Sequence, residues 1–309
     1  MKQIIEYYYG IVIENYIKDN DAHVFIYNNE LFYFVLYERA KDELYEIIQL
    51  SKELKQHRVG CHDLIFNRFN KVVTIFNNRE CVLLRVRRDY SEEISSLDMF
   101  KINSNLLISD KKRNSYKNNW KELWKSKIDY FENQIRDYGK EKRSILNTFS
   151  YYIGLAENAI QYIEVVNQKY SYTILDRLTF CHRRIFYPNY KLNYLNPLSF
   201  IIDLEVRDYA EYFKATFFGG DDIKSEFVSL LKVNKMSSYS YNMLFARLLF
   251  PTYYFDVYEK IIHNEIKEDK LIEILNYRVK YEKFLKFAYN EIKKYTSMPT
   301  IPWLNITIN

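Results

Sequence analysis

The residues of this chain best suited to chemistry lie in two segments of its second half. The first is HRRIFYPN, from His182 to Asn189, and the second is FIIDLEVRD, from Phe200 to Asp208. Asn189 and Asp203 carry the amide and carboxylate oxygens with which proteins hold Mg²⁺ beside a phosphate. The fourteen residues from one to the other suit a hairpin that brings the chain back to the same place. We therefore expect Asn189 and Asp203 to face one site.

The order of these residues follows the loops of phosphotransferases. Protein kinases use H-R-D-L-x-x-x-N. Kinases of small molecules commonly use H-G-D-x-x-x-x-N, then a strand ending I-D-[FWL]-E and a helix that begins like D-L-A. The corresponding positions of this chain are His182-Arg183-Arg184, Asn189, Ile202-Asp203-Leu204-Glu205 and Asp208-Tyr209-Ala210. An alternative stays open, in which Asp203 only ends a buried strand and Asp208 only caps a helix.

Arg184 stands at the position of the catalytic base in this pattern. In a kinase the aspartate there accepts the proton of the attacking hydroxyl. Arginine cannot take a proton, because the pKa of its guanidinium is above about 12. Arg184 could instead bind a phosphate or a carboxylate, or form an ion pair with Asp203 that fills the magnesium position with protein. We expect His182 to brace the loop and to act neither as acid nor as base.

The parts of a kinase that handle the nucleotide are also degraded. The turn of the first expected hairpin, Asn28-Asn29, has no glycine with which to cover the phosphates. The following strand ends in Tyr37 and Glu38 where a lysine is expected, and Lys41 lies beyond it. With Arg184, three separate features are lost, which favours weak or absent ATP binding. We expect no cofactor, and Mg²⁺ with ATP only if some kinase activity remains.

The elements around these loops predict an α+β fold with two lobes, like that of protein kinases. β-Branched and aromatic runs predict hairpins at 23–37 and 71–86, with a helix at 41–57 between them. Residues 1–90 would form a small antiparallel β lobe. Residues 91–117 would form a hinge or linker, and residues 118–309 a larger, mainly helical lobe.

Helical periodicity dominates the second part of the chain. Apolar residues at helical spacing predict helices over 118–138, 142–167, 206–218, 222–233, 238–250, 253–266 and 268–296. Pro251 suits the start of a helix, where its missing N–H costs nothing. The chain has 31 tyrosines, and we expect most of them to lie in the core or half-exposed, with the ring buried and the hydroxyl in water.

Composition excludes several other classes of protein. A net charge of +5 over 309 residues, without a dense basic stripe, does not suit a nucleic-acid binder. No apolar run is long enough to span a membrane, and the N-terminus lacks the features of a signal peptide. The three cysteines have no paired spacing, which is typical of a protein made in a reducing cytosol.

Several motifs give the chain a family resemblance. It resembles the CotS-like spore coat proteins of endospore formers, and most closely their YutH branch. The resemblance rests on the segments Leu178–Arg184, Ile202–Asp203, Arg207–Tyr212, Arg247–Asp256 and Ile301–Leu304. It implies a fold like that of aminoglycoside and choline kinases, and a place in the spore coat after synthesis in the mother-cell cytoplasm. Its partners would be other coat proteins.

Two functions follow from these patterns. The first is a spore coat pseudokinase that keeps a phosphotransferase-like fold for protein–protein contacts. The second is an atypical small-molecule kinase that transfers phosphate from ATP to a hydroxyl and uses Asp203 and Asp208. In either case the cofactor-binding candidates are Asn189, Asp203 and Asp208, and any metal would be held by Asn189 and Asp203. We expect no nucleic-acid partner and no membrane insertion.

Overall fold

The computed structural model describes residues 1–19, 22–86, 92–104, 118–138, 142–188 and 190–305. The chain forms two compact units. The first unit contains residues 1–107 together with 180–202, and the second contains 108–179 and 203–309. Residues 180–202, which carry part of the candidate site, thus belong to the same unit as the N-terminal residues. A division of the sequence into consecutive segments does not predict this arrangement.

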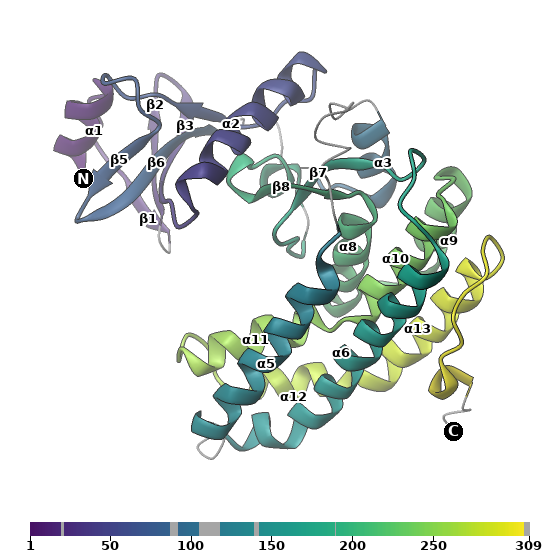
Figure 1. Ribbon diagram of the computed structural model, residues 1–309. Helices are drawn as coiled ribbons and strands as arrows, with labels where there is room; N and C mark the ends of the chain where they lie inside the picture. Colours follow the sequence, from purple (N-terminus) through teal and green to yellow (C-terminus); the bar gives the residue numbers. More distant parts are fainter. Residues whose placement is uncertain (20–21, 87–91, 105–117, 139–141, 189, 306–309) are drawn as a thin grey trace. The chain divides into compact units, whose positions relative to one another are not determined.

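The N-terminal unit is built on an antiparallel sheet (Figure 1). The strands follow the order β1-β2-β3-β6-β4, and β5 also pairs with β6. Their bounds are β1 Ile17–Asp19, β2 Ala22–Tyr27, β3 Glu30–Leu36, β4 Asp63–Ile65, β5 Val73–Phe76 and β6 Arg79–Val86. Both predicted hairpins are present. Each turns on a pair of asparagines with positive φ, Asn28-Asn29 and Asn77-Asn78, as two-residue hairpin turns require.

Each face of this sheet has its own core. Helix α2, Lys41–Gln56, confirms the predicted helix and buries Ile47 with Val82 on one face. The other face buries Phe25, Phe34 and Leu83 against Ile5. Ile5 belongs to helix α1, Lys2–Tyr9, which the sequence patterns did not reveal. Two helices on opposite faces therefore shield the central strands.

The expected linker and the hairpin segment contain regular structure of their own. Helix α3, Ser96–Ser104, lies within the segment 91–117 that we expected to be a hinge. Strands β7, Leu178–His182, and β8, Phe200–Leu204, form a two-stranded sheet. Between them lie helix α7, Lys191–Tyr194, and the short 3-10 helix η2, Pro197–Ser199. The boundary between the two units passes through both strands of this small sheet.

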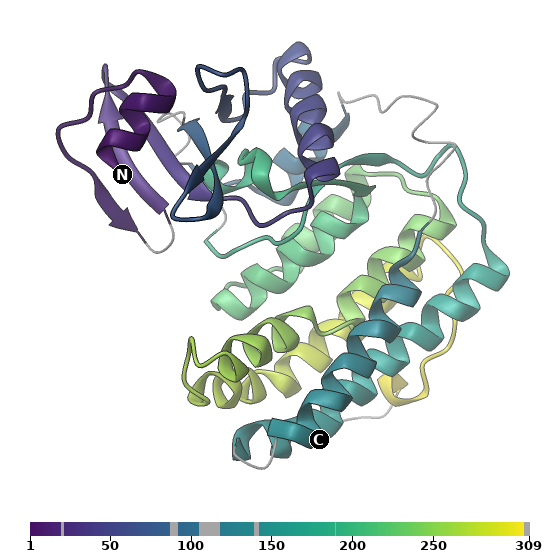
Figure 2. The ribbon, with the colours of Figure 1, turned by 60° about the vertical axis from the view of Figure 1, so that its left-hand side comes forward.

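The second unit is helical (Figure 2). Its helices are α5 Trp120–Tyr138, α6 Arg143–Lys169, α8 Val206–Gly219, α9 Lys224–Val233, α10 Ser238–Leu249, α11 Thr252–Ile262, α12 Asp269–Asn276 and α13 Arg278–Ile292, followed by the 3-10 helix η3 Pro302–Asn305. Helix α10 lies at the centre and packs on α6, α8 and α13. The predicted helices are confirmed except the last. The helix expected over 268–296 is two helices, divided at Tyr277.

Aromatic side chains fill the core of the helical unit. Tyr152 stacks on Tyr254 with ring centroids 4.0 Å apart, and Phe131 stacks on Phe255 at 4.6 Å. All four of these rings are buried. Stacked aromatic pairs add to the free energy that burial alone provides. The tyrosines of this unit thus serve mainly as core residues, in agreement with the sequence.

Candidate functional site

Asp203 is held by donors from the protein on both carboxylate oxygens. Its Oδ2 accepts a hydrogen bond from Trp120 Nε1 at 2.9 Å and another from the Arg207 guanidinium at 3.0 Å. Its Oδ1 accepts the backbone N–H of Leu204 at 2.8 Å. Only 7% of Asp203 is exposed. The candidate metal ligand is therefore engaged within the helical unit.

Local structure explains why these groups meet. Asp203 lies next to the end of β8, and Arg207 lies one helical turn further on, at the start of α8. Side chains four residues apart can meet on one face of a chain that enters a helix. Trp120 is the first residue of α5, and its backbone N–H donates to the side-chain oxygen of Asn118 at 3.0 Å. The start of α5 is thereby fixed where the indole reaches Asp203.

This arrangement does not fit a magnesium ligand. A divalent ion needs a lone pair of Asp203 at about 2.0–2.1 Å. The oxygen Oδ2 already accepts two hydrogen bonds, and one of them carries the positive charge of Arg207. A second cation on the same oxygen would be repelled by that charge in a mostly buried place. Asn189, the other expected ligand, lies outside the described residues.

Asp208 is fully buried in the first turn of α8. The helix is preceded by Glu205, whose carbonyl accepts the backbone N–H of Asp208 at 3.2 Å. A carboxylate in the first turn of a helix interacts favourably with the helix dipole. Asp203 thus lies near the end of a strand, as the structural alternative has it, whereas Asp208 lies inside the first turn of α8 and not at its N-cap, which is Glu205.

A buried charge cluster lies behind the Asp203 site. Glu211 Oε1 accepts hydrogen bonds from Lys214 Nζ at 2.8 Å and from Arg247 Nε at 2.7 Å, and the Arg247 guanidinium stacks 4.8 Å from the centre of the Trp120 ring. Burial lowers the pKa of Lys214 to about 8. Burial would raise the pKa of Glu211, but the two cations outweigh it and hold that pKa well below its usual range. The sequence patterns did not single out this cluster, although Glu211 and Arg247 lie in segments that carry the family resemblance.

His182 and Arg184 belong to the N-terminal unit. His182 is buried, and its Nε2 bonds to the carbonyl oxygen of Tyr194 at 2.6 Å. This bond ties β7 to the end of α7. Arg184 donates to the carbonyl of Arg183 at 2.8 Å. Both His182 and Arg184 line a cavity of about 80 Å³, far below the volume that small-molecule sites commonly have. The pairing of Arg184 with Asp203 stays a prediction.

The positions expected to handle the nucleotide shift by one strand, because the sheet begins with a strand that the sequence did not predict. Strand β1 precedes β2, so Asn28-Asn29 joins the second and third strands of the sheet and not the first two. The residues between β1 and β2 are Asn20-Asp21, which lie outside the described residues and include no glycine. The third strand, ELFYFVL, has no lysine. Lys41 is exposed and lies 3.5 Å from Glu80.

Arg39 forms an ion pair with helix α2 in the N-terminal unit. Its Nε donates to Glu43 in α2 at 2.9 Å. Its NH1 donates to the backbone carbonyls of Leu198 at 2.9 Å and Phe200 at 2.8 Å. The hydrogen bond from the Arg39 guanidinium is the main reason that the pKa of Glu43 is lowered. Glu43 is thus engaged by Arg39, which ties the start of α2 to residues 198–200.

Solved structures define the class of this fold. The chain is similar to an aminoglycoside phosphotransferase from Alicyclobacillus acidocaldarius, with a TM-score of 0.64 and 11% identity over 95% of this chain and 96% of that one. It is also similar to a spectinomycin phosphotransferase, solved with ADP and spectinomycin, with a TM-score of 0.54 and 13% identity over 94% and 97%. These likenesses confirm a two-lobe, kinase-like α+β fold. At such low identity they show the fold alone.

Sequence comparison identifies the family within this class. The model of the family described as "Spore coat putative kinase YutH" matches residues 2–288. The chain therefore belongs to this family, which confirms the resemblance found in its motifs. It is also 31% identical to the endospore coat-associated protein YutH of Bacillus subtilis over 206 residues. That match covers 60% of this chain and 61% of the relative's length.

The described residues contain neither a cluster of metal ligands nor a membrane-spanning helix. Across the described ranges, no group of three or more His, Cys, Asp or Glu side chains is placed to hold a metal ion. No helix in the described part of the chain combines the length and apolar character needed to cross a bilayer.

Proposed function

We propose that this protein is a pseudokinase of the spore coat, which keeps a phosphotransferase-like fold for contacts with other coat proteins. The observation that carries this proposal is the state of Asp203. Trp120 and Arg207 occupy the oxygen that a kinase would offer to magnesium. The fold would then be retained for its shape and surface.

The degraded nucleotide features support the same proposal. The third strand lacks a lysine, and the sequence at 20–21 lacks a glycine. Arg184 at the base position cannot accept a proton from a substrate hydroxyl. Each of these differences alone could be compensated elsewhere. Together they remove the groups that position ATP, its metal and the nucleophile.

The names of the family and of the relative support a role in the spore coat. The relative is an endospore coat-associated protein, and the family is described as a spore coat putative kinase. The localisation that we expected, the spore coat, agrees with both. A role among coat proteins then follows from a fold whose chemistry is impaired, because what remains for it to offer is surface.

Nucleotide binding provides the direct test. The melting temperature of the protein is measured with about 5 mM Mg-ATP, with ATP and EDTA, and with neither. We expect shifts below about 1 °C, since a ligand stabilises a fold only when its concentration exceeds its Kd. A shift of several degrees that needs magnesium would overturn the proposal. The matched variant Arg207→Gln removes the cation from Asp203 and reports whether Arg207 alone excludes the metal.

The alternative, an atypical small-molecule kinase, rests on Asp203 and Asp208. Its test is turnover of ATP with sugars, choline and aminoglycosides as acceptors. If a turnover is found, Asp203→Ala must abolish it, whereas the pseudokinase proposal expects no turnover in either protein. The buried, hydrogen-bonded state of Asp203 favours the pseudokinase.

A further inference from the structure

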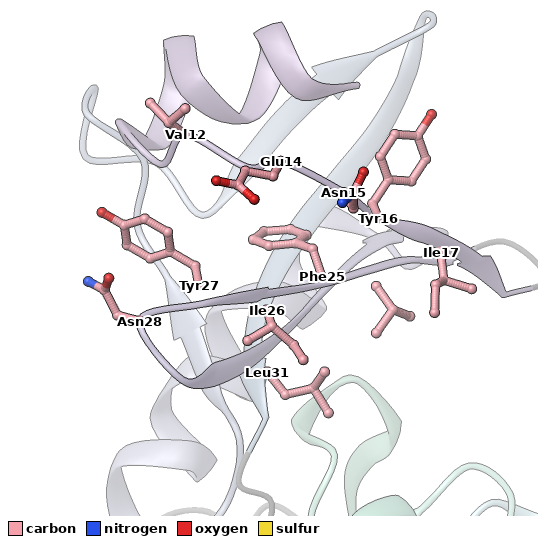
Figure 3. A pocket seen from close by; sticks show the side chains of 11 residues that line it. Val12, Glu14, Asn15, Tyr16, Ile17, Phe25, Ile26, Tyr27, Asn28 and Leu31 are labelled. Carbon is pink, nitrogen blue, oxygen red and sulfur yellow. The ribbon is translucent and has the colours of Figure 1, made fainter.

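The edge of strand β2 opens onto an apolar cavity in the N-terminal unit. The cavity has a volume of about 570 Å³, within the range of peptide and small-molecule sites. Figure 3 shows its walls, the segment from Val12 to Ile17 on one side and β2 with its turn on the other. Val12, Ile17 and Ile26 are 64%, 72% and 60% exposed. Apolar side chains are thus gathered on a surface open to water.

The cavity exists because β1 ends its pairing early. Strand β1 pairs with β2 only from Ala22 to Val24, with Ile17 opposite Val24. Continuing that register would place Asn15 opposite Ile26, but the pairing does not extend to it. The chain from Val12 to Tyr16 instead leaves the sheet and forms the other wall of the cavity.

Strand geometry shows what β2 presents along this open edge. Tyr27 and Glu30 flank the two-residue turn and are paired in register. Such a pair exchanges both of its hydrogen bonds, and bonding direction alternates along an antiparallel strand. The N–H and C=O of Ile26 therefore point away from β3, toward the cavity. Within the described residues, Ile26 has no partner in β1 for either group.

The side chains at this edge suit a further strand. Ile17, Val24 and Ile26 share one face of the sheet by register, while Phe25 and Tyr27 lie on the other. An added strand would therefore meet apolar groups on both of its faces. A single acid, Glu14, lines the cavity, and its carboxylate has no ion pair among the described residues. Lys2 donates to the backbone carbonyl of Glu14 and leaves that carboxylate unpaired.

We infer that this slot binds an extended peptide segment of a partner protein by β-strand addition. The partner segment would hydrogen-bond to Ile26 through its backbone, alternate apolar side chains along its length, and place a lysine or arginine against Glu14. Backbone bonds give affinity in this mode of recognition, and side-chain pockets give specificity. The inference rests on the proposed function, since it identifies one surface for the contacts with coat proteins.

The first test uses a defined peptide. A fluorescein-labelled peptide of alternating valine and threonine with one lysine is titrated against the full chain and followed by anisotropy. Its matched control replaces the central valine with proline, which removes a backbone N–H and disfavours strand pairing. We expect the alternating peptide to bind at least about tenfold more tightly than the control. Equal binding of the two peptides, or no binding up to about 1 mM, would overturn the inference.

Protein variants then distinguish the contribution of the Ile26 backbone N–H to peptide binding from that of the Ile26 side chain. Ile26→Pro removes the outward N–H and leaves the bonds to β3, whereas Ile26→Val keeps the N–H and most of the apolar surface. We expect Ile26→Pro to lose the peptide and Ile26→Val to bind within about threefold of wild type. Glu14→Lys should weaken the lysine peptide and strengthen one with glutamate in that place. Circular dichroism checks that each variant is folded.

Hydrogen exchange keeps the inference testable if Ile26→Pro fails to fold. In the wild-type protein the bound peptide should slow exchange of the Ile26 amide, and protection elsewhere without Ile26 would contradict the slot. Concentration-dependent dimers that protect Ile26 without peptide would assign the slot to a second copy of this chain and refute a peptide partner. The nucleotide test is independent of these measurements. A failed slot with no ATP binding leaves the pseudokinase proposal standing.

Discussion

The indole nitrogen of Trp120 donates to a carboxylate oxygen of Asp203 at 2.9 Å, across 83 residues of sequence. Arg207 shares the same oxygen. A carboxylate that would face an ion in a kinase is here part of the packing between the start of α5 and the end of β8. The stability of the helical unit should therefore depend on it.

We predict that Asp203→Ala lowers the free energy of unfolding by about 3 kcal/mol. The change removes the acceptor that Trp120 and Arg207 share in a mostly buried place, and such losses are costly. Asp203→Asn keeps an oxygen acceptor and should cost about half as much. Urea unfolding followed by fluorescence measures both. An increase in stability on removing Asp203, as expected for a carboxylate kept for a metal, would contradict this account.

A double-mutant cycle isolates the Trp120–Asp203 bond. Trp120→Phe removes the N–H but keeps an aromatic ring beneath Arg247, while Asp203→Ala removes the acceptor. We expect a coupling free energy of about 1 kcal/mol or more, because hydrogen bonds to charged groups exceed the average. Additive effects of the two substitutions would show that the indole does not bond to Asp203 in solution.

The buried cluster predicts an order of stability among its variants. Glu211→Gln leaves Lys214 and Arg247 as two buried cations without their anion, and should cost about 3–5 kcal/mol. Lys214→Met leaves Glu211 paired with Arg247, so it should cost less. Urea unfolding of both variants gives the comparison. A Lys214→Met protein less stable than Glu211→Gln would refute this electrostatic explanation.

Tyr9 predicts a loss of stability in alkali. Burial raises its pKa to about 12, while its hydroxyl bonds to that of Thr74 at 2.9 Å. A folded-state pKa above the unfolded value of about 10 gives stability that is complete below pH 10. That contribution is lost as the pH rises toward 12. The stability advantage of wild type over Tyr9→Phe should shrink by about 1 kcal/mol between pH 8 and 11. An equal difference at both pH values would contradict the prediction.

Local patterns predicted much of the fold. The paired asparagines at 28–29 and 77–78 mark both hairpins because asparagine accepts positive φ. Apolar spacing marks most helices because one face must be buried. The break at Tyr277 was not visible, since the apolar spacing continues through it and the division depends on packing. Helix α1 was hidden in a β-like aromatic composition.

The candidate site was predicted less completely, for a physical reason. The pattern singled out Asp203 as a candidate ligand, and its neighbour Arg207 could be read from the four-residue spacing. Trp120 reaches Asp203 across 83 residues and Arg247 reaches Glu211 across 36, so both contacts form only through tertiary packing. The open edge of β2 depends on where β1 stops pairing, which no local signal in the sequence fixes.

The position of Arg207 has a consequence for the dependence of this fold on its surroundings. A metal ion must be drawn from solution, so its occupancy varies with supply and with chelators. Arg207 lies four residues from Asp203 in the same chain, so the local concentration of its guanidinium at the carboxylate is fixed by chain geometry. The positive charge that balances Asp203 is thus a covalent part of the chain and does not depend on a bound ion. This unit should keep its charge balance whether divalent ions are scarce or abundant.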